Sequence, residues 1–132
     1  MKNGAFDPYF ESSLLKIFER WDAPPKKDEL TITLSGVVLS ALYYNADATL
    51  KMLDQSGRTE VFFSETFRLA KHTRHSYQRK LFIFGLSCCL KASYVPAYVQ
   101  NNLVVIVTQI CLMLARLKIA GMSHLPLALR AL

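Results

Sequence analysis

The C-terminal half of this sequence contains no acidic residue. Residues 66–132 carry nine Lys and Arg and neither Asp nor Glu, whereas residues 1–65 carry seven basic and ten acidic residues, so the halves hold +9 and −3 of a net charge of +6. A surface of one sign attracts groups of the opposite sign. We expect residues 66–132 to face an acidic partner, an anionic surface, or acidic residues supplied by a longer chain.

Glycine and proline are scarce, with five of each, and the glycines are far apart. This spacing excludes a Gly-rich phosphate loop, and Ser87 lacks the second glycine of a nucleophile elbow. His72 and His75 are three residues apart but have no acidic residue beside them, and His124 is isolated. The sequence therefore predicts no catalytic, cofactor-binding or metal-ligating residue, no cofactor and no enzymatic activity.

Cysteine is also sparse. Cys88, Cys89 and Cys111 make an odd number, two of them are adjacent, and no pair has CxxC spacing. This pattern argues against a disulfide framework and favours a reducing compartment. We expect all three to be small core residues, as free cysteines often are.

Long hydrophobic runs are absent as well. The most apolar stretch, from Leu103 to Leu114, has 12 residues and includes Thr108 and Gln109. A membrane-spanning helix needs about 20 apolar residues, so we expect a buried helix here and no membrane insertion. No apolar segment follows Met1, so no secretory signal peptide is expected.

The residues that are present form helical patterns. The apolar residues Leu14, Ile17 and Phe18 recur at spacings of three and four, which is a helical pattern. No segment of useful length alternates apolar and polar residues with a period of two. Segment 28–44 should bury an inner stripe that includes Val37. The capping and helix-terminating residues predict about six helices, with N-caps at Asp28, Thr59 and Ser76 and a C-terminal stop at Gly57. The expected ranges are 7–21, 28–44, 47–55, 59–72, 76–91 and 96–118, the last with a break at 101–102.

These helices are joined by short connections, which favours antiparallel packing of consecutive helices. Helix pairs starting near Asp7, Asp47 and Ser76 give a spacing of roughly 30 to 40 residues, the size of one α-solenoid repeat. We therefore predict an all-α fold of the α-α superhelix (HEAT/armadillo-like) type over residues 1–120, with 121–132 as a divergent tail. A compact bundle is the alternative on pattern alone.

A basic run is the most function-like feature of the chain: Arg68, Lys71, Arg74, Arg79 and Lys80. Such a run can contact the phosphates of a nucleic acid, or it can be the solvated outer face of a helical hairpin. Aromatic residues that could stack on bases are not interleaved with it, and only Tyr77 is outside the expected core. This favours the solvated face.

Three strings resemble one family in order and separation. They are Phe6-Asp7-Pro8-Tyr9 with the helix after it, Leu39-Ser40-Ala41-Leu42-Tyr43-Tyr44-Asn45, and His75-Ser76-Tyr77-Gln78-Arg79-Lys80 continuing into Leu81-Phe82-Ile83-Phe84-Gly85-Leu86. Together, over residues 4–118, they resemble the C-terminal half of the importin seven/eight subgroup of the importin-beta (karyopherin-beta) superfamily. Gly85 in this set is expected to permit a close approach of two helices.

The resemblance implies a HEAT-repeat fragment of a nuclear transport receptor, a protein-binding scaffold for nucleocytoplasmic import. Cargo proteins and Phe-Gly nucleoporins would be bound through the full-length parent, in cytoplasm and nucleus. The small GTPase Ran would be bound only through N-terminal repeats that this chain lacks. The alternative is an independent all-α module that binds nucleic acid through its basic half.

Overall fold

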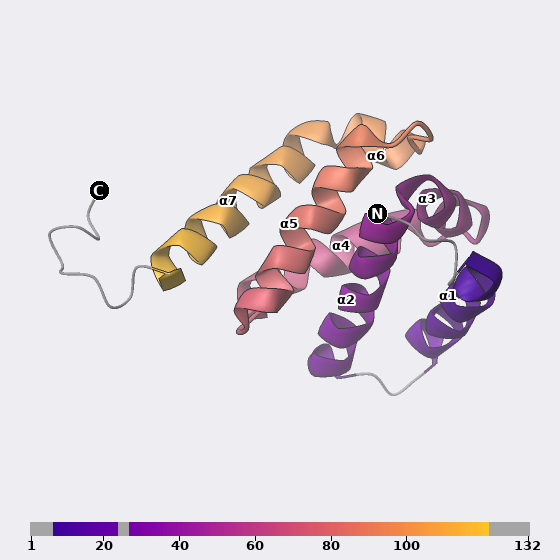
Figure 1. Cartoon of the computed structure of the whole chain (residues 1–132), viewed down its shortest axis with the longest axis horizontal. Coiled ribbons are helices and arrows are strands. Elements are labelled where there is room, and N and C mark those ends of the chain that lie inside the picture. Colours follow the sequence, from indigo (N-terminus) through magenta and orange to yellow (C-terminus); the bar gives the residue numbers. More distant parts are fainter. Residues whose placement is uncertain (1–6, 24–26, 122–132) are drawn as a thin grey trace, which may run out of the picture.

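The computed structural model describes residues 7–23 and 27–121, and every element in these ranges is helical (Figure 1). The elements are α1 (Asp7–Asp22), α2 (Asp28–Tyr44), α3 (Ala46–Gln55), α4 (Thr59–Leu69), the 3-10 turn η1 (Ala70–His72), α5 (Ser76–Lys91), α6 (Ala97–Asn101) and α7 (Leu103–Gly121). The all-α prediction is confirmed, and the packed helices fit a helical-repeat-like fold.

The described part has seven α-helices rather than about six. The expected helix 96–118 is divided where a break was predicted, at Asn102, whose side-chain Nδ2 donates to the Tyr98 carbonyl at 2.7 Å. The predicted tail falls almost wholly on residues 122–132, which lie outside the described residues, as does the turn at 24–26.

The predicted caps are displaced by one residue. Asp28, Thr59 and Ser76 are the first helical residues of α2, α4 and α5, and their side chains do not cap them. A side-chain cap is found instead at Asn45, whose Oδ1 accepts the Ala48 amide at 3.2 Å. The predicted stop at Gly57 is confirmed, because this residue has a φ of 70°, a conformation that glycine adopts without a steric penalty.

Helices α2 and α5 lie side by side and run in the same direction (Figure 1). Their N-terminal ends share one cleft, and their C-terminal ends share another hollow. Helix α7 packs on the far side of α5 in the opposite direction, since Arg116 near its end reaches the Ala70 carbonyl at 2.8 Å. Helix α1 packs antiparallel on the other side of α2.

The contact between α2 and α5 is close because α5 has a glycine at the crossing. A Cβ atom added at Gly85 would lie 2.8 Å from Leu39 Cδ2 and 2.9 Å from the Leu39 carbonyl oxygen. The prediction that Gly85 permits close helix approach is thereby confirmed. Helix α2 is the second helix of the first predicted pair and α5 is the first helix of the third pair, so this contact joins helices that do not correspond in the predicted repeats.

Helices α3 and α4 pack against the pair α2 and α5 and close the core. Phe63 of α4 is fully buried and stacks on Tyr98 with ring centroids 5.6 Å apart. Two burial predictions are wrong. Val37 is 40% exposed, since it lies at the edge of the α2 stripe. Helix α7 was expected to be buried, yet it contributes only a seam of Ile106, Ile110 and Met113 to the core.

Candidate protein-binding surfaces

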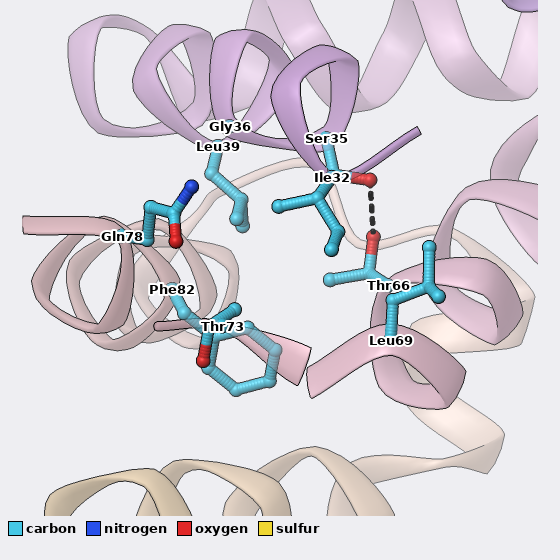
Figure 2. Close-up of a pocket in the computed structure, with 9 residues that line it drawn as sticks. All are labelled: Ile32, Ser35, Gly36, Leu39, Thr66, Leu69, Thr73, Gln78 and Phe82. Carbon is cyan, nitrogen blue, oxygen red and sulfur yellow. Dashed lines mark hydrogen bonds between the residues drawn. The ribbon is translucent and has the colours of Figure 1, made fainter. Parts of the chain in front are cut away.

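A small pocket lies between α2, α4 and α5 and is too small for a ligand (Figure 2). Its volume is about 30 Å³, which is room for one water molecule. Figure 2 shows the Thr66 hydroxyl facing that of Ser35, with the two oxygens 3.5 Å apart. The two hydroxyl groups bond to each other at the wall of the pocket, which has no room for a substrate.

A polar cleft of about 390 Å³ opens where α2 and α5 begin. Asp28 and Glu29 line it from α2, facing His72, Arg74 and His75. The His75 ring stacks on Tyr77 with centroids 5.6 Å apart. Acidic groups of the first half thus lie opposite basic groups of the second half. Part of the opposite charge of the two halves is therefore brought together within the chain.

The predicted basic run is only partly available to a partner. Arg68 bonds to Asp28 at 3.1 Å and also to Glu65. Arg79 donates to the Thr73 carbonyl at 3.2 Å. Lys71, Arg74 and Lys80 are exposed, and no ion pair forms at them within the described residues. With Arg68 neutralised and Arg79 held to the backbone, the run is a weaker phosphate-binding surface than its sequence indicates.

Other acidic residues of the first half stabilise a turn of the second half. Asp47 Oδ1 accepts the backbone N–H groups of Ser93 and Tyr94 at 2.7 and 2.9 Å. The Tyr94 hydroxyl donates to Asp54 at 2.7 Å, and this bond raises the pKa of Tyr94 above its usual value. Helix α3 is thereby attached to the connection between α5 and α6. These carboxylates thus contribute to holding the fold together.

An apolar groove of about 320 Å³ runs along the surface between α1 and α2. Phe10, Leu14 and Ile17 line it from α1, and Val37 and Tyr44 line it from α2. Its volume lies within the range of small-ligand sites, and its lining is almost entirely apolar. A groove of this kind can accept one or two apolar side chains of another protein.

Sequence reasoning did not identify this groove. Val37 was assigned to the core together with its neighbours, whereas the structure places it half-exposed on the groove wall. One indication in the sequence is the width of the α2 stripe, which contains more apolar residues than one neighbouring helix can cover. Which helix packs beside α2, and how much of the stripe it leaves uncovered, is decided only by tertiary packing.

The cysteines differ from one another in exposure. Cys89 is buried, Cys88 is half-buried and Cys111 is exposed, so the prediction that all three are core residues is wrong for Cys111. Burial and the neighbouring Cys88 raise the pKa of Cys89 to about 12, which makes its thiol a poor nucleophile. Ser87 lies half-buried within α5.

Within the described ranges, no three His, Cys, Asp or Glu side chains are grouped so as to hold a metal ion. His72 and His75 line the same polar cleft, and His124 lies outside the described residues. In those same ranges no helix has the length and hydrophobicity to cross a bilayer.

Known protein families, curated proteins and solved structures contain no match to this chain.

Proposed function

We propose that this chain is a helical-repeat segment that binds other proteins, and that it acts in a nuclear transport receptor of the importin-beta superfamily. The apolar groove between α1 and α2 is the observation that carries the protein-binding part of this proposal. The receptor assignment is supported by the resemblance over residues 4–118 and by the all-helical, helical-repeat-like packing.

The groove suits aromatic side chains from an extended partner segment. A cavity of about 150 Å³ lined by aliphatic and aromatic residues already holds a benzene ring, and this groove has about 320 Å³. Phe10 forms its wall and packs on Tyr44, with ring centroids 5.5 Å apart. Phe-Gly segments of nucleoporins, which the resemblance implies as partners, supply such rings one at a time. Each ring buried here contributes about 2 kcal/mol.

One ring gives weak binding, so we expect a dissociation constant well above 1 mM for a single motif, because 1 mM already corresponds to about 4 kcal/mol. Several linked motifs would bind more tightly through effective concentration to a parent chain that offers several such grooves. Binding of a Phe-Gly peptide should shift the amide NMR signals of residues along the groove, and a peptide with Ser in place of Phe should not shift them. Equal shifts with both peptides, or none with either, would refute the proposal.

A matched pair of variants locates the site. Val37 lies in the groove and is 40% exposed, whereas Val61 of α4 is 49% exposed and lies outside it. Val37→Glu should abolish the peptide-induced shifts because it places a charge on an apolar wall. Val61→Glu should leave them intact. Circular dichroism of both variants would verify that the helices are retained.

The alternative, nucleic-acid binding, is favoured by the exposed cations Lys71, Arg74 and Lys80. Its test is retention on RNA that falls steeply with added salt. Arg74→Glu combined with Lys80→Glu should remove this retention without disturbing the groove, because neither side chain lines it. Salt-sensitive RNA binding in the absence of Phe-Gly binding would favour this alternative.

A further inference from the structure

The outer side of α5 carries a row of exposed aromatic and basic side chains. They are Tyr77, Lys80, Phe84 and Lys91, at spacings of three, four and seven residues, which place them on one helical face. Tyr77 is 61% exposed, Phe84 is 51% exposed, and both lysines are exposed. This row, the α5 ridge, faces away from the side of α5 that is buried in the core.

A neighbouring repeat would leave the α5 ridge uncovered. In Figure 1, α7, α5, α2 and α1 follow one another side by side, and α3 and α4 pack against the pair α2 and α5. Helix α5 therefore has a helix on each flank. A repeat added at either end of this row of helices would pack on α1 or on α7. The ridge stays exposed because α5 lies in the middle of the row.

Two aromatic pairs lie along the ridge. Phe84 packs against Tyr43 of α2 with ring centroids 5.8 Å apart, and Tyr43 is 63% exposed. Tyr77 stacks on His75 with centroids 5.6 Å apart. The interval of seven residues from Tyr77 to Phe84 corresponds to roughly 10 Å along the helix axis. On sequence alone only Tyr77 lies outside the expected core, so the exposure of Phe84 supplies a second aromatic face.

The surroundings of the ridge favour an anionic partner. Within the described ranges no ion pair forms at either of its lysines, and the C-terminal half contains no acidic residue. Helix α2 has acidic residues only in its first turn, Asp28 and Glu29, which line the polar cleft. Asp47 lines the hollow beside Lys91, but its carboxylate already accepts two backbone amides. The lysines of the ridge thus have positive charge available to a partner.

We propose that the α5 ridge binds single-stranded nucleic acid, with bases against Tyr77 and Phe84 and phosphates at Lys80 and Lys91. Rings and cations alternate along the ridge, as bases and phosphates do along an unpaired strand. A duplex keeps the faces of its bases inside the stack, and an acidic peptide has no regular succession of rings. None of these side chains lines the α1–α2 groove, so the proposal does not rest on the proposed function.

Strands with and without bases test the stacking. Fluorescence anisotropy would measure binding of the whole chain to labelled single strands of about 12 nucleotides, one of RNA and one of DNA, and to an abasic strand with the same phosphates. At least one of the two strands with bases should bind tenfold or more tightly than the abasic strand, and the tighter of the two shows which sugar the ridge prefers. Equal binding of all three would overturn the proposal, because the cations of the basic run alone would then explain it.

Substitutions on the ridge separate stacking from charge. Phe84→Ala should weaken binding of the strand with bases by about tenfold without changing its salt dependence, and should not affect the abasic strand. Lys80→Ala should lower the slope of log affinity against log salt by about 0.7, the value for one phosphate of a single strand. Tyr9→Ala removes a ring that is 64% exposed on α1, and Lys51→Ala removes an exposed charge from α3. Neither control should reproduce the effect of its partner.

Circular dichroism would verify that each variant keeps its helices. Phe84→Leu retains an apolar contact with Tyr43 but removes the ring, so it should weaken binding as Phe84→Ala does. Equal effects of Phe84→Ala and Tyr9→Ala would refute binding at the ridge. If an acidic peptide containing Phe bound more tightly than either strand and lost binding in Phe84→Ala, the ridge would belong to a protein partner and the proposal would be wrong. Loss of Phe-Gly binding at the α1–α2 groove would leave it standing.

Discussion

Replacing Gly85 with alanine adds one methyl group at the closest contact between α2 and α5. The added carbon would lie 2.8 Å from Leu39 Cδ2, 2.9 Å from the Leu39 carbonyl oxygen and 3.0 Å from Leu39 Cβ. The Leu39 side chain can rotate, but its backbone oxygen can move only if the whole of α2 moves. The two helices must therefore separate locally by roughly half an ångström, at the centre of a tightly packed core.

The magnitude follows from two opposing effects. Alanine is favoured over glycine within a helix by about 1 kcal/mol. Overpacking costs 1–3 kcal/mol, and the fixed backbone oxygen places this site near the top of that range, at about 3 kcal/mol. Gly85→Ala should thus lower the free energy of unfolding by about 2 kcal/mol.

Gly36 provides the control, because it also lies within a helix and an added Cβ would meet nothing within 4 Å. Gly36→Ala should raise the free energy of unfolding by about 1 kcal/mol. The difference between the two variants cancels helix propensity and isolates the steric overlap. Urea unfolding followed by circular dichroism measures both values. If Gly85→Ala were as stable as Gly36→Ala, the close approach of α2 and α5 would be wrong.

Three further predictions follow from the contacts of α3 and α5. Asp47→Ala should lower the free energy of unfolding, measured by urea titration, by about 2 kcal/mol, since it removes the charge-assisted hydrogen bonds to the Ser93 and Tyr94 amides, and Asp47→Asn should cost less. The Tyr94 hydroxyl bond to Asp54 raises the pKa of Tyr94 above 10.0, so the folded state holds this proton more tightly than the unfolded state does. The stability from this bond is present below about pH 10 and is lost as pH rises through the raised pKa, so the urea midpoint should fall at high pH. Tyr94→Phe should remove the part of this fall that comes from Tyr94. With a thiol pKa of about 12, Cys89 should resist alkylation at neutral pH until the chain unfolds, as peptide mass mapping of labelled protein would show.

The helix boundaries were predictable from local chemistry. Segment 28–44 was predicted with the bounds that α2 has, and the glycine at 57 ends α3 with a positive φ. The break in the last helix was predicted at the asparagine pair that separates α6 from α7. Caps, breaks and periodicity act over three or four residues, so a single sequence window contains them.

The candidate sites were not predictable in the same way. Arg68 was grouped with neighbouring cations; one of its acidic partners, Glu65, lies three residues earlier, but the other, Asp28, lies 40 residues earlier in the chain. Residues 103–114 were expected to form a buried helix, although only one side of α7 meets α5. Apolar composition indicates that a face needs covering, but it does not identify which element covers it.

The sequence by itself determined an all-helical chain, the ends of its helices and the opposite charges of its halves. Only the tertiary structure decided that Gly85 sits against Leu39, that acidic side chains of the first half neutralise or cap parts of the second, and that α1 and α2 leave a groove between them. The reason is that helix formation depends on neighbours within one or two turns, whereas docking depends on the shapes of surfaces that lie tens of residues apart.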